Sequence, residues 1–140
     1  MHVTAERVAH NAKLRSAQAL VEFALAVSVF LLLVLGTFDT ARAYLAYTVV
    51  SNAAREASRY AAAHVGETGW AAAAQQAGMN LTVGIDQSAL NLNVAAPTQM
   101  DGLPYIRASG TYRFHSITPL VGALLGDPII IQVDTSVLAG

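Results

Sequence analysis

The 140-residue chain contains no cysteine and few charged residues. Without cysteine it has neither a disulfide framework nor a thiolate nucleophile or metal ligand. Charged residues make up 12% and the net charge is −1, so the chain lacks the basic field that nucleic-acid binding needs and has no acidic tail. Apolar residues make up 54%, an excess that favours a membrane segment.

Motifs that carry chemistry are also missing. The sequence has no G-x-S-x-G, no P-loop, no H-E-x-x-H and no closely spaced pair of carboxylates. The four histidines lack the spacing of metal ligands; they are His2, His10, His64 and His115. We therefore expect no enzyme, no catalytic residue, no cofactor or metal, and neither a small-molecule substrate nor a nucleic-acid partner.

One long apolar run stands out near the N-terminus. The segment from Phe23 to Phe38 is uncharged, and it extends back through Glu22 to Ala17. A membrane-spanning helix needs about 20 apolar residues, so the pattern predicts a span at about residues 18–38 with Glu22 near its edge. A carboxylate at that position is costly in lipid and calls for a reason.

The charges around this run predict its orientation. Arg7, Lys13 and Arg15 precede it, and Asp39 is the first charge after it. By the positive-inside rule, residues 1–17 form a cytoplasmic leader and the chain from about residue 40 lies outside. Two other interpretations stay open: a cleaved secretory signal that ends at Ala43 and releases a domain starting at Tyr44, and an ordinary anchor in which Glu22 reaches the headgroups.

Residues 39–65 contain neither proline nor glycine and are rich in alanine, the best helix former. The sequence therefore predicts one helix over residues 18–64, about 70 Å long at 1.5 Å per residue. Aromatic and small residues recur on one face at steps of three or four; they are Tyr44, Tyr47, Ser51, Ala54 and Ser58. We expect part of this stripe to pack on the protein's own sheet and its upper part to be open to neighbouring subunits.

Residues 65–140 are predicted to form a strand-rich domain outside the membrane. Gly66 and Gly69 end the long helix, and residues 70–80 form a short second helix closed by Gly78. Period-two patterns predict strands at 80–85, 89–96, 104–116 and 128–138, with Gly110 at a bulge or hairpin tip. Residues 116–127 could form a loop or a short helix. The predicted fold is α+β, a long N-terminal helix packed on a small, mainly antiparallel sheet.

The stretch "RSAQALVEFAL", the apolar run and "GTFDTARAYLAYTVVSNAAREASRYAA" together resemble the TadE-like family, the pseudopilins or minor pilins of tight-adherence (Tad/Flp, type IVc) pilus systems. The resemblance covers about residues 15–62. The matching positions are Gln18, Val21, Glu22, Phe23, Gly36, Asp39, Arg42, the run Asn52-Ala53-Ala54-Arg55-Glu56, and Arg59-Tyr60. Ala17 stands where the family usually has glycine.

This resemblance implies a function and a set of partners. A prepilin peptidase would cut between Ala17 and Gln18, which leaves Glu22 at the fifth position of the mature chain. Glu22 and Phe23 would act in processing and assembly, and helix packing would involve Gly36, Asp39, Arg42, Tyr44 and Tyr47. The protein would lie in the bacterial inner membrane as a single-pass subunit, meet other pilins, pseudopilins and the assembly platform, and join or prime an adhesive or secretory pilus. The alternative is a permanently anchored assembly scaffold that never enters a filament.

Helix geometry gives Glu22 a role within that scheme. A new amino terminus on Gln18 lies four residues from Glu22, so the ammonium and the carboxylate share one helix face. Pairing with the ammonium of an adjacent subunit would offset the cost of the charge and fix the axial register. A carboxylate that merely lies at the interface is the alternative.

Overall fold

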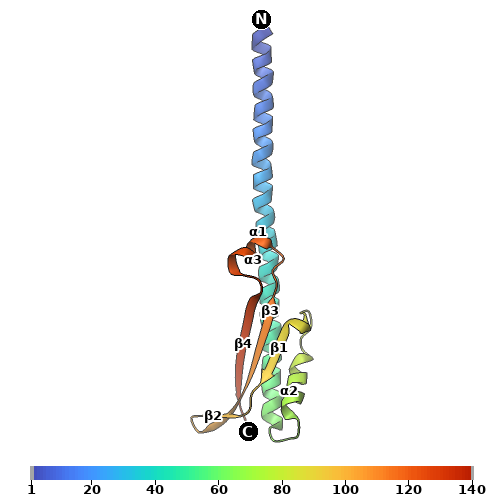
Figure 1. Cartoon of the computed structure of the whole chain (residues 1–140), viewed down its shortest axis with the longest axis vertical. Helices are drawn as coiled ribbons and strands as arrows, with labels where there is room; N and C mark the ends of the chain where they lie inside the picture. The colour runs from blue at the N-terminus through green and yellow to red at the C-terminus, as the bar shows by residue number, and fades with distance from the viewer. Residues whose placement is uncertain (1, 140) are drawn as a thin grey trace. The chain divides into compact units, whose positions relative to one another are not determined.

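The computed structural model describes the backbone of residues 2–139 and the side chains of residues 15–139 (Figure 1). The chain divides into two compact units, residues 1–38 and residues 39–140. Helix α1 (His2–His64) supplies residues to both. It begins before residue 18, where we predicted its start, because residues 2–17 contain no glycine or proline to interrupt it.

The end of α1 agrees with the sequence prediction. The helix stops at His64, and Gly66 and Gly69 then adopt positive φ angles of 97° and 76°. Only glycine enters that region without a steric cost, so this pair turns the chain back. Helix α2 (Trp70–Met79) follows directly.

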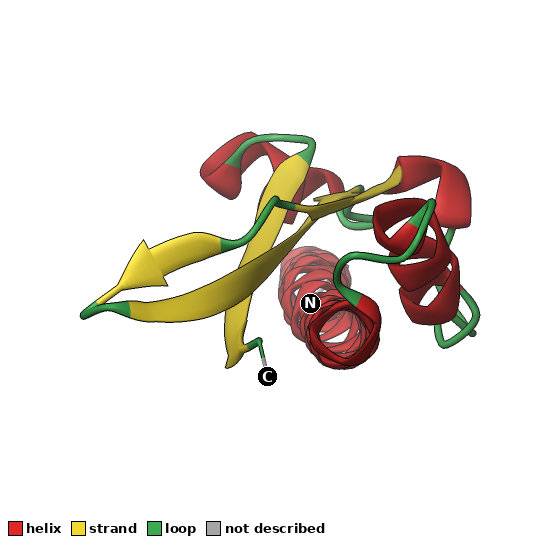
Figure 2. Cartoon of the chain, turned by 90° about the horizontal axis from the view of Figure 1, so that it is seen from below, coloured by secondary structure: helices red, strands yellow, loops and turns green. Residues whose placement is uncertain are grey.

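The second unit contains a four-stranded antiparallel sheet, which confirms the predicted α+β class. Its remaining elements are the 3-10 turn η1 (Gln87–Ala89), β1 (Leu90–Val94), β2 (Thr98–Met100), β3 (Leu103–Phe114), α3 (Pro119–Leu125) and β4 (Ile129–Leu138). Strand β3 lies in the centre, with β4 along one side and β1 and β2 in turn along the other. Figure 2 shows the strands on one side of α1, with α2 beside it.

Strand β2 was missed by the sequence patterns, although its turn carries a clear signal. Asp101 and Gly102 have φ angles of 54° and 79°, and they join Met100 to its partner Leu103. Two consecutive positive φ angles in a two-residue loop suit an Asp-Gly hairpin turn.

The core of the second unit is built from small residues of α1. Ala53, Ala54, Ala57 and Ala61 are fully buried beneath Leu92, Ile106 and other inward side chains of the sheet. Because alanine adds so little bulk, the backbones of the sheet and of α2 approach the helix closely. Along β1, buried residues alternate with exposed ones, as expected for a strand with one face on the core and the other open.

Two glycines occur where this approach is tightest, and both correct a sequence prediction. Gly78 does not close α2 but lies inside it, where an added Cβ would come within 2.6 Å of the Ala53 carbonyl oxygen. Gly110 is neither a bulge nor a hairpin tip. It pairs regularly with Leu92 and Val133, and an added Cβ would meet Val50 Cγ1 at 2.6 Å.

Two further segments were misjudged or left open. Residues 80–85 do not form a strand; they make a loop in which Thr82 donates its hydroxyl to the Met79 carbonyl and Gly84 has a φ of 85°. Their apolar alternation resembles a strand, but the positive φ and the local hydrogen bond break the extended backbone. Residues 119–125 form a helix, α3, which begins at Pro119.

The contact between Gly110 and Val50 can be tested by a mutant cycle. We expect Gly110→Ala to lower the free energy of unfolding by about 1–3 kcal/mol, because the new methyl overlaps Val50 Cγ1. Adding Val50→Ala to that variant should cost less than Val50→Ala alone, since the methyl then fills vacated space. Urea unfolding of the full chain in detergent, followed by the single tryptophan Trp70, measures this. Ser109→Ala, on the opposite face of β3, is the matched control, and strictly additive costs would contradict the contact.

Candidate functional site

The four predicted processing and assembly positions lie on the outer surface of α1 within the first unit. Ala17, Gln18, Glu22 and Phe23 are all exposed. The Gln18 side chain donates a hydrogen bond from Nε2 to Glu22 Oε1 at 3.2 Å, so the structure brings these two together. No ion pair joins Glu22 to a cation within residues 15–139. The carboxylate is therefore presented outward from an otherwise apolar segment.

The apolar run after Glu22 is uncovered by the rest of the chain. Among the described residues, α1 contains one segment that is long and apolar enough to cross a membrane, and none of that window is buried. Large side chains are exposed all round it; examples are Phe23, Leu25, Phe30, Leu33 and Phe38. A helix that is apolar on every side needs lipid or other helices around it, which fits a single-pass membrane protein.

Polar groups and the glycine inside this run are compatible with lipid. Ser28 and Thr37 donate their hydroxyls to the carbonyls four residues earlier, each at 2.8 Å, so neither hydroxyl is left unsatisfied in an apolar solvent. A Cβ added at Gly36 would meet nothing within 4 Å. Contacts inside the chain therefore do not require glycine there, whereas close packing against another helix in a membrane would.

Asp39 opens the second unit as a buried carboxylate with three donors. It is 2% exposed and accepts hydrogen bonds from the backbone N–H of Ile117 at 2.9 Å and of Thr118 at 2.7 Å. Arg42 Nη1 lies 3.2 Å from Asp39 Oδ1. Thr118 is the N-cap of α3, so Asp39 ties the start of α3 to α1.

These donors favour the ionised form of Asp39. The Ile117 N–H has the largest effect, and with the Thr118 N–H and Arg42 it lowers the pKa of Asp39 from 3.8 to about 2, although burial acts in the opposite direction. The folded protein thus holds a charged carboxylate at this position throughout the neutral and mildly acidic range.

Arg42 is fixed within the second unit as well. Its Nη1 also donates to the His115 carbonyl at 3.4 Å, and its guanidinium lies 5.2 Å from the centre of the Phe114 ring. That distance suits a cation–π contact. Arg42 therefore joins α1 to the end of β3, next to the loop that Asp39 holds.

Tyr44 and Tyr47 point away from the protein's own sheet. They are 72% and 51% exposed, whereas Ser51, Ala54 and Ser58 further along the predicted stripe are buried. The stripe is thus divided, with its lower part packed against the sheet and its aromatic upper part uncovered. Exposed neighbouring tyrosines are typical of a contact surface.

Charged residues in the stretch that resembles the TadE-like family form a local cluster on α1. Glu56 accepts two hydrogen bonds from Arg59, at 2.7 and 2.9 Å, as their spacing of three residues predicts. Asn52 and Arg55 border the same shallow surface hollow, together with Leu81 from the loop after α2. Exposed pairs of this kind contribute little to stability.

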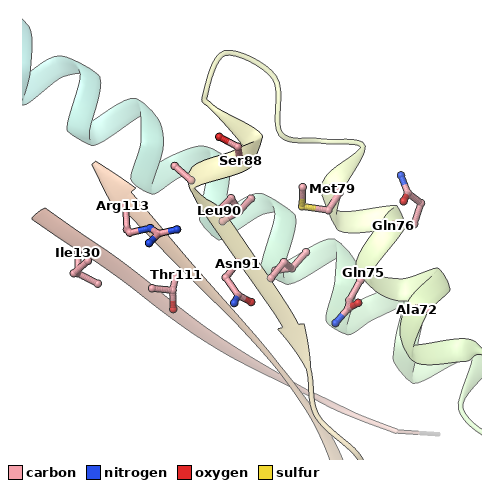
Figure 3. Close-up of a pocket in the computed structure, with 12 residues that line it drawn as sticks. Ala72, Gln75, Gln76, Met79, Ser88, Leu90, Asn91, Thr111, Arg113 and Ile130 are labelled. Atoms are coloured by element: carbon pink, nitrogen blue, oxygen red, sulfur yellow. The ribbon is translucent and has the colours of Figure 1, made fainter. Parts of the chain in front are cut away.

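A larger groove of about 860 Å³ lies between α2 and the sheet (Figure 3). Gln75, Gln76 and Met79 line it from α2, and Asn91, Thr111 and Arg113 from β1 and β3. Arg113 is the single charged side chain in its lining, which contains neither a carboxylate nor an imidazole. The groove therefore offers no acid–base pair for catalysis.

Helical spacing accounts for some of the contacts of these α1 residues and not for others. Helical spacing placed Gln18 and Glu22 on one face, and the structure shows their side chains in contact, whereas the contact between Asp39 and Arg42 was not predicted. The sequence prediction also missed the backbone donors of residues 117 and 118, which lie far along the chain. The only local signal was Thr118-Pro119, typical of a helix start.

Residues 17–59 match the model of the family described as TadE-like protein. This confirms the resemblance stated from the sequence, over nearly the same residues. A TadE-like segment suggests a protein associated with a Tad pilus. Neither a curated protein nor a solved structure gives a significant match to the chain.

Acid should weaken the second unit through Asp39. Because its pKa is lower in the folded chain than in the unfolded one, its stabilising effect is complete above about pH 4 and is lost as the pH falls towards 2. We expect the melting temperature of the full chain in detergent, followed by Trp70 fluorescence, to fall over that range. Asp39→Asn should melt lower at neutral pH and show a weaker pH dependence between 4 and 2.

The comparison needs a control, because Glu56 and Asp86 also have lowered pKa values and titrate in the same direction. The lowering comes mainly from Arg59 for Glu56 and from Ser88 for Asp86. Asp101→Asn, in the exposed hairpin turn, removes one carboxylate and keeps a residue that tolerates positive φ. If both variants lose stability with acid as steeply as the parent, Asp39 is not the group responsible.

Proposed function

We propose that this protein is a minor pilin or pseudopilin-like subunit of a tight-adherence (type IVc) pilus. A prepilin peptidase cuts between Ala17 and Gln18, and the mature chain packs against other subunits through α1. The span lies in the bacterial inner membrane with residues 1–17 in the cytoplasm and residues 65–140 outside. The family match over residues 17–59 supports this proposal because it includes the proposed cut and the whole apolar run.

The observation that carries the proposal is the position of Glu22. Its carboxylate is exposed at the edge of a bare apolar segment, on the same face as Gln18 and in contact with that side chain. A peptidase cut before Gln18 would place an ammonium beside this carboxylate, where none exists in the uncut chain. Processing thus supplies a cationic partner for a carboxylate that forms no ion pair with residues 15–139.

Pairing between subunits explains why such a charge is useful. In lipid or in a filament core an unpaired carboxylate is costly, and an ammonium of a neighbouring helix relieves the cost only at one axial offset. The pair therefore selects the register of neighbouring helices. Tyr44 and Tyr47, exposed further along α1, extend the same packing surface outside the membrane.

We also propose that the protein is structural rather than catalytic. Its main groove contains one cation and no acid–base pair, and the family match covers α1 alone. Its partners are then the membrane, the prepilin peptidase, other pilin and pseudopilin subunits, and the assembly platform.

The N-terminus of the mature protein tests the proposal first. Mass spectrometry of protein recovered from membranes should find a chain that begins at Gln18, and replacing Ala17 with Phe should block the cut because the peptidase site accepts a small residue there. A start at Met1 or His2 would favour the permanent anchor, and a start at Tyr44 would favour a secreted domain.

The role of Glu22 is tested in the cut protein. We expect Glu22→Gln, which keeps the shape and removes the charge, to be processed normally but to be several-fold depleted from sheared pili. Glu67→Gln, in the exposed loop before α2, is the control and should enter pili like the parent. Equal incorporation of both variants would show that Glu22 does not determine assembly, and pili that lack even the parent protein would support the anchored scaffold.

A further inference from the structure

We propose that α3 and the residue pair before it form a membrane-interface foot, which lies in the headgroup region of the same bilayer that the span crosses. The foot is defined as residues 117–125. Nothing in the family match bears on it, because that match ends at residue 59.

The surface of the foot is unusually apolar. Ile117, Leu120, Leu124 and Leu125 are 63%, 57%, 80% and 67% exposed, and no residue from 116 to 126 carries a charge. Four large aliphatic side chains exposed within nine residues form a patch that soluble surfaces usually avoid.

At Gly122, α3 lies close to the two segments that flank it in the sequence. A Cβ at Gly122 would come 2.9 Å from Ser116 Oγ and 3.5 Å from Asp127 Cβ. The Gly126 N–H closes the helix on the Gly122 carbonyl at 2.9 Å. The four aliphatic side chains lie on the outer surface, and no residue of α3 is buried.

Asp39 places this surface at the height of the membrane boundary. The N–H groups of Ile117 and Thr118 bond to its carboxylate, and Asp39 directly follows Phe38, the last residue of the apolar run. With its seven residues α3 is about 10 Å long at 1.5 Å per residue, so every exposed leucine lies within about that distance of Thr118 along the helix axis. This holds whatever angle the span makes with the second unit.

Headgroups and the upper acyl chains are the occupant that this location favours. Apolar side chains enter an interface to about 5–10 Å, which matches the reach of the foot. Arg42 and His115 flank it with half-exposed and exposed side chains, and Arg42 carries a positive charge that suits lipid phosphates. The foot thus lies next to Asp39, the residue that directly follows the apolar run.

The cysteine-free chain allows a direct test with single labels. The full chain, reconstituted in phosphatidylethanolamine–phosphatidylglycerol vesicles, carries an environment-sensitive fluorophore on Leu124→Cys. We expect blue-shifted emission, quenched more by lipids with bromines near the headgroup than by lipids brominated near the chain ends. A label on Leu31→Cys, in the middle of the run, should show the reverse order.

Two more variants complete the design. A label on Ser136→Cys should stay unquenched, because residue 136 lies about 23 Å along β4 from Ile129 at 3.3 Å per residue. Adding Leu120→Asp and Leu125→Asp should abolish quenching at residue 124 while leaving residue 31 unchanged. Both sites are exposed, and an unchanged Trp70 melting curve shows that the fold is kept.

The outcomes separate the foot from the proposed span. Quenching at residue 31 but not at residue 124 overturns the foot alone, whereas no quenching at residue 31 overturns the membrane insertion on which both rest. A blue shift at residue 124 that appears only at high protein-to-lipid ratio, without bromine quenching, shows that a second copy covers α3 and also overturns the proposal.

Discussion

The close contact between the alanine face of α1 and the backbones of α2 and β3 is the constraint on which the second unit depends. Ala53 and Ala57 are fully buried, and Gly78 and Gly110 leave no room for a Cβ against them or against Val50. Stability here comes from close packing rather than from bulky side chains, so single methyl groups matter. The apolar run before Asp39 differs, because no sheet covers it and its large side chains are exposed all round.

Asp39 lies where α1 changes from a segment with exposed large side chains to one whose small residues pack against the sheet. A buried carboxylate is tolerated there because two backbone N–H groups and Arg42 donate to it, and the same bonds bring α3 beside α1. One side chain thus joins the end of the apolar run to a crossover more than seventy residues away. The charged form is the one that performs this task, which is why protonation weakens the tie.

Sequence patterns predicted those parts of the fold that are determined by residues close to them in the sequence. The end of α1 follows from Gly66 and Gly69, and strands β1, β3 and β4 follow from period-two alternation. Gly78 and Gly110 were misjudged because their cause is a neighbour distant in sequence, and residues 80–85 were misjudged because an apolar alternation also suits a tight loop. The resemblance to the TadE-like family singled out Gln18 and Glu22, and their shared helix face was predicted from their spacing. The partners of Asp39 could not be, since no periodicity links residue 39 to residue 117.

Residues 117–125 also affect the energetics of leaving the membrane. Eleven large apolar side chains are exposed from Leu20 to Phe38, against four in the foot, so the foot adds about a third to the number of side chains that would leave lipid in the proposed assembly. Partial insertion of those four contributes roughly 3–6 kcal/mol, taking half of the usual burial value for each. The proposed lipid contact at α3 would therefore oppose extraction from the bilayer, while the span dominates the cost. In the proposed assembly, filament contacts and the Glu22 pair would have to offset both, so a charge placed on α3 should make extraction easier without altering α1.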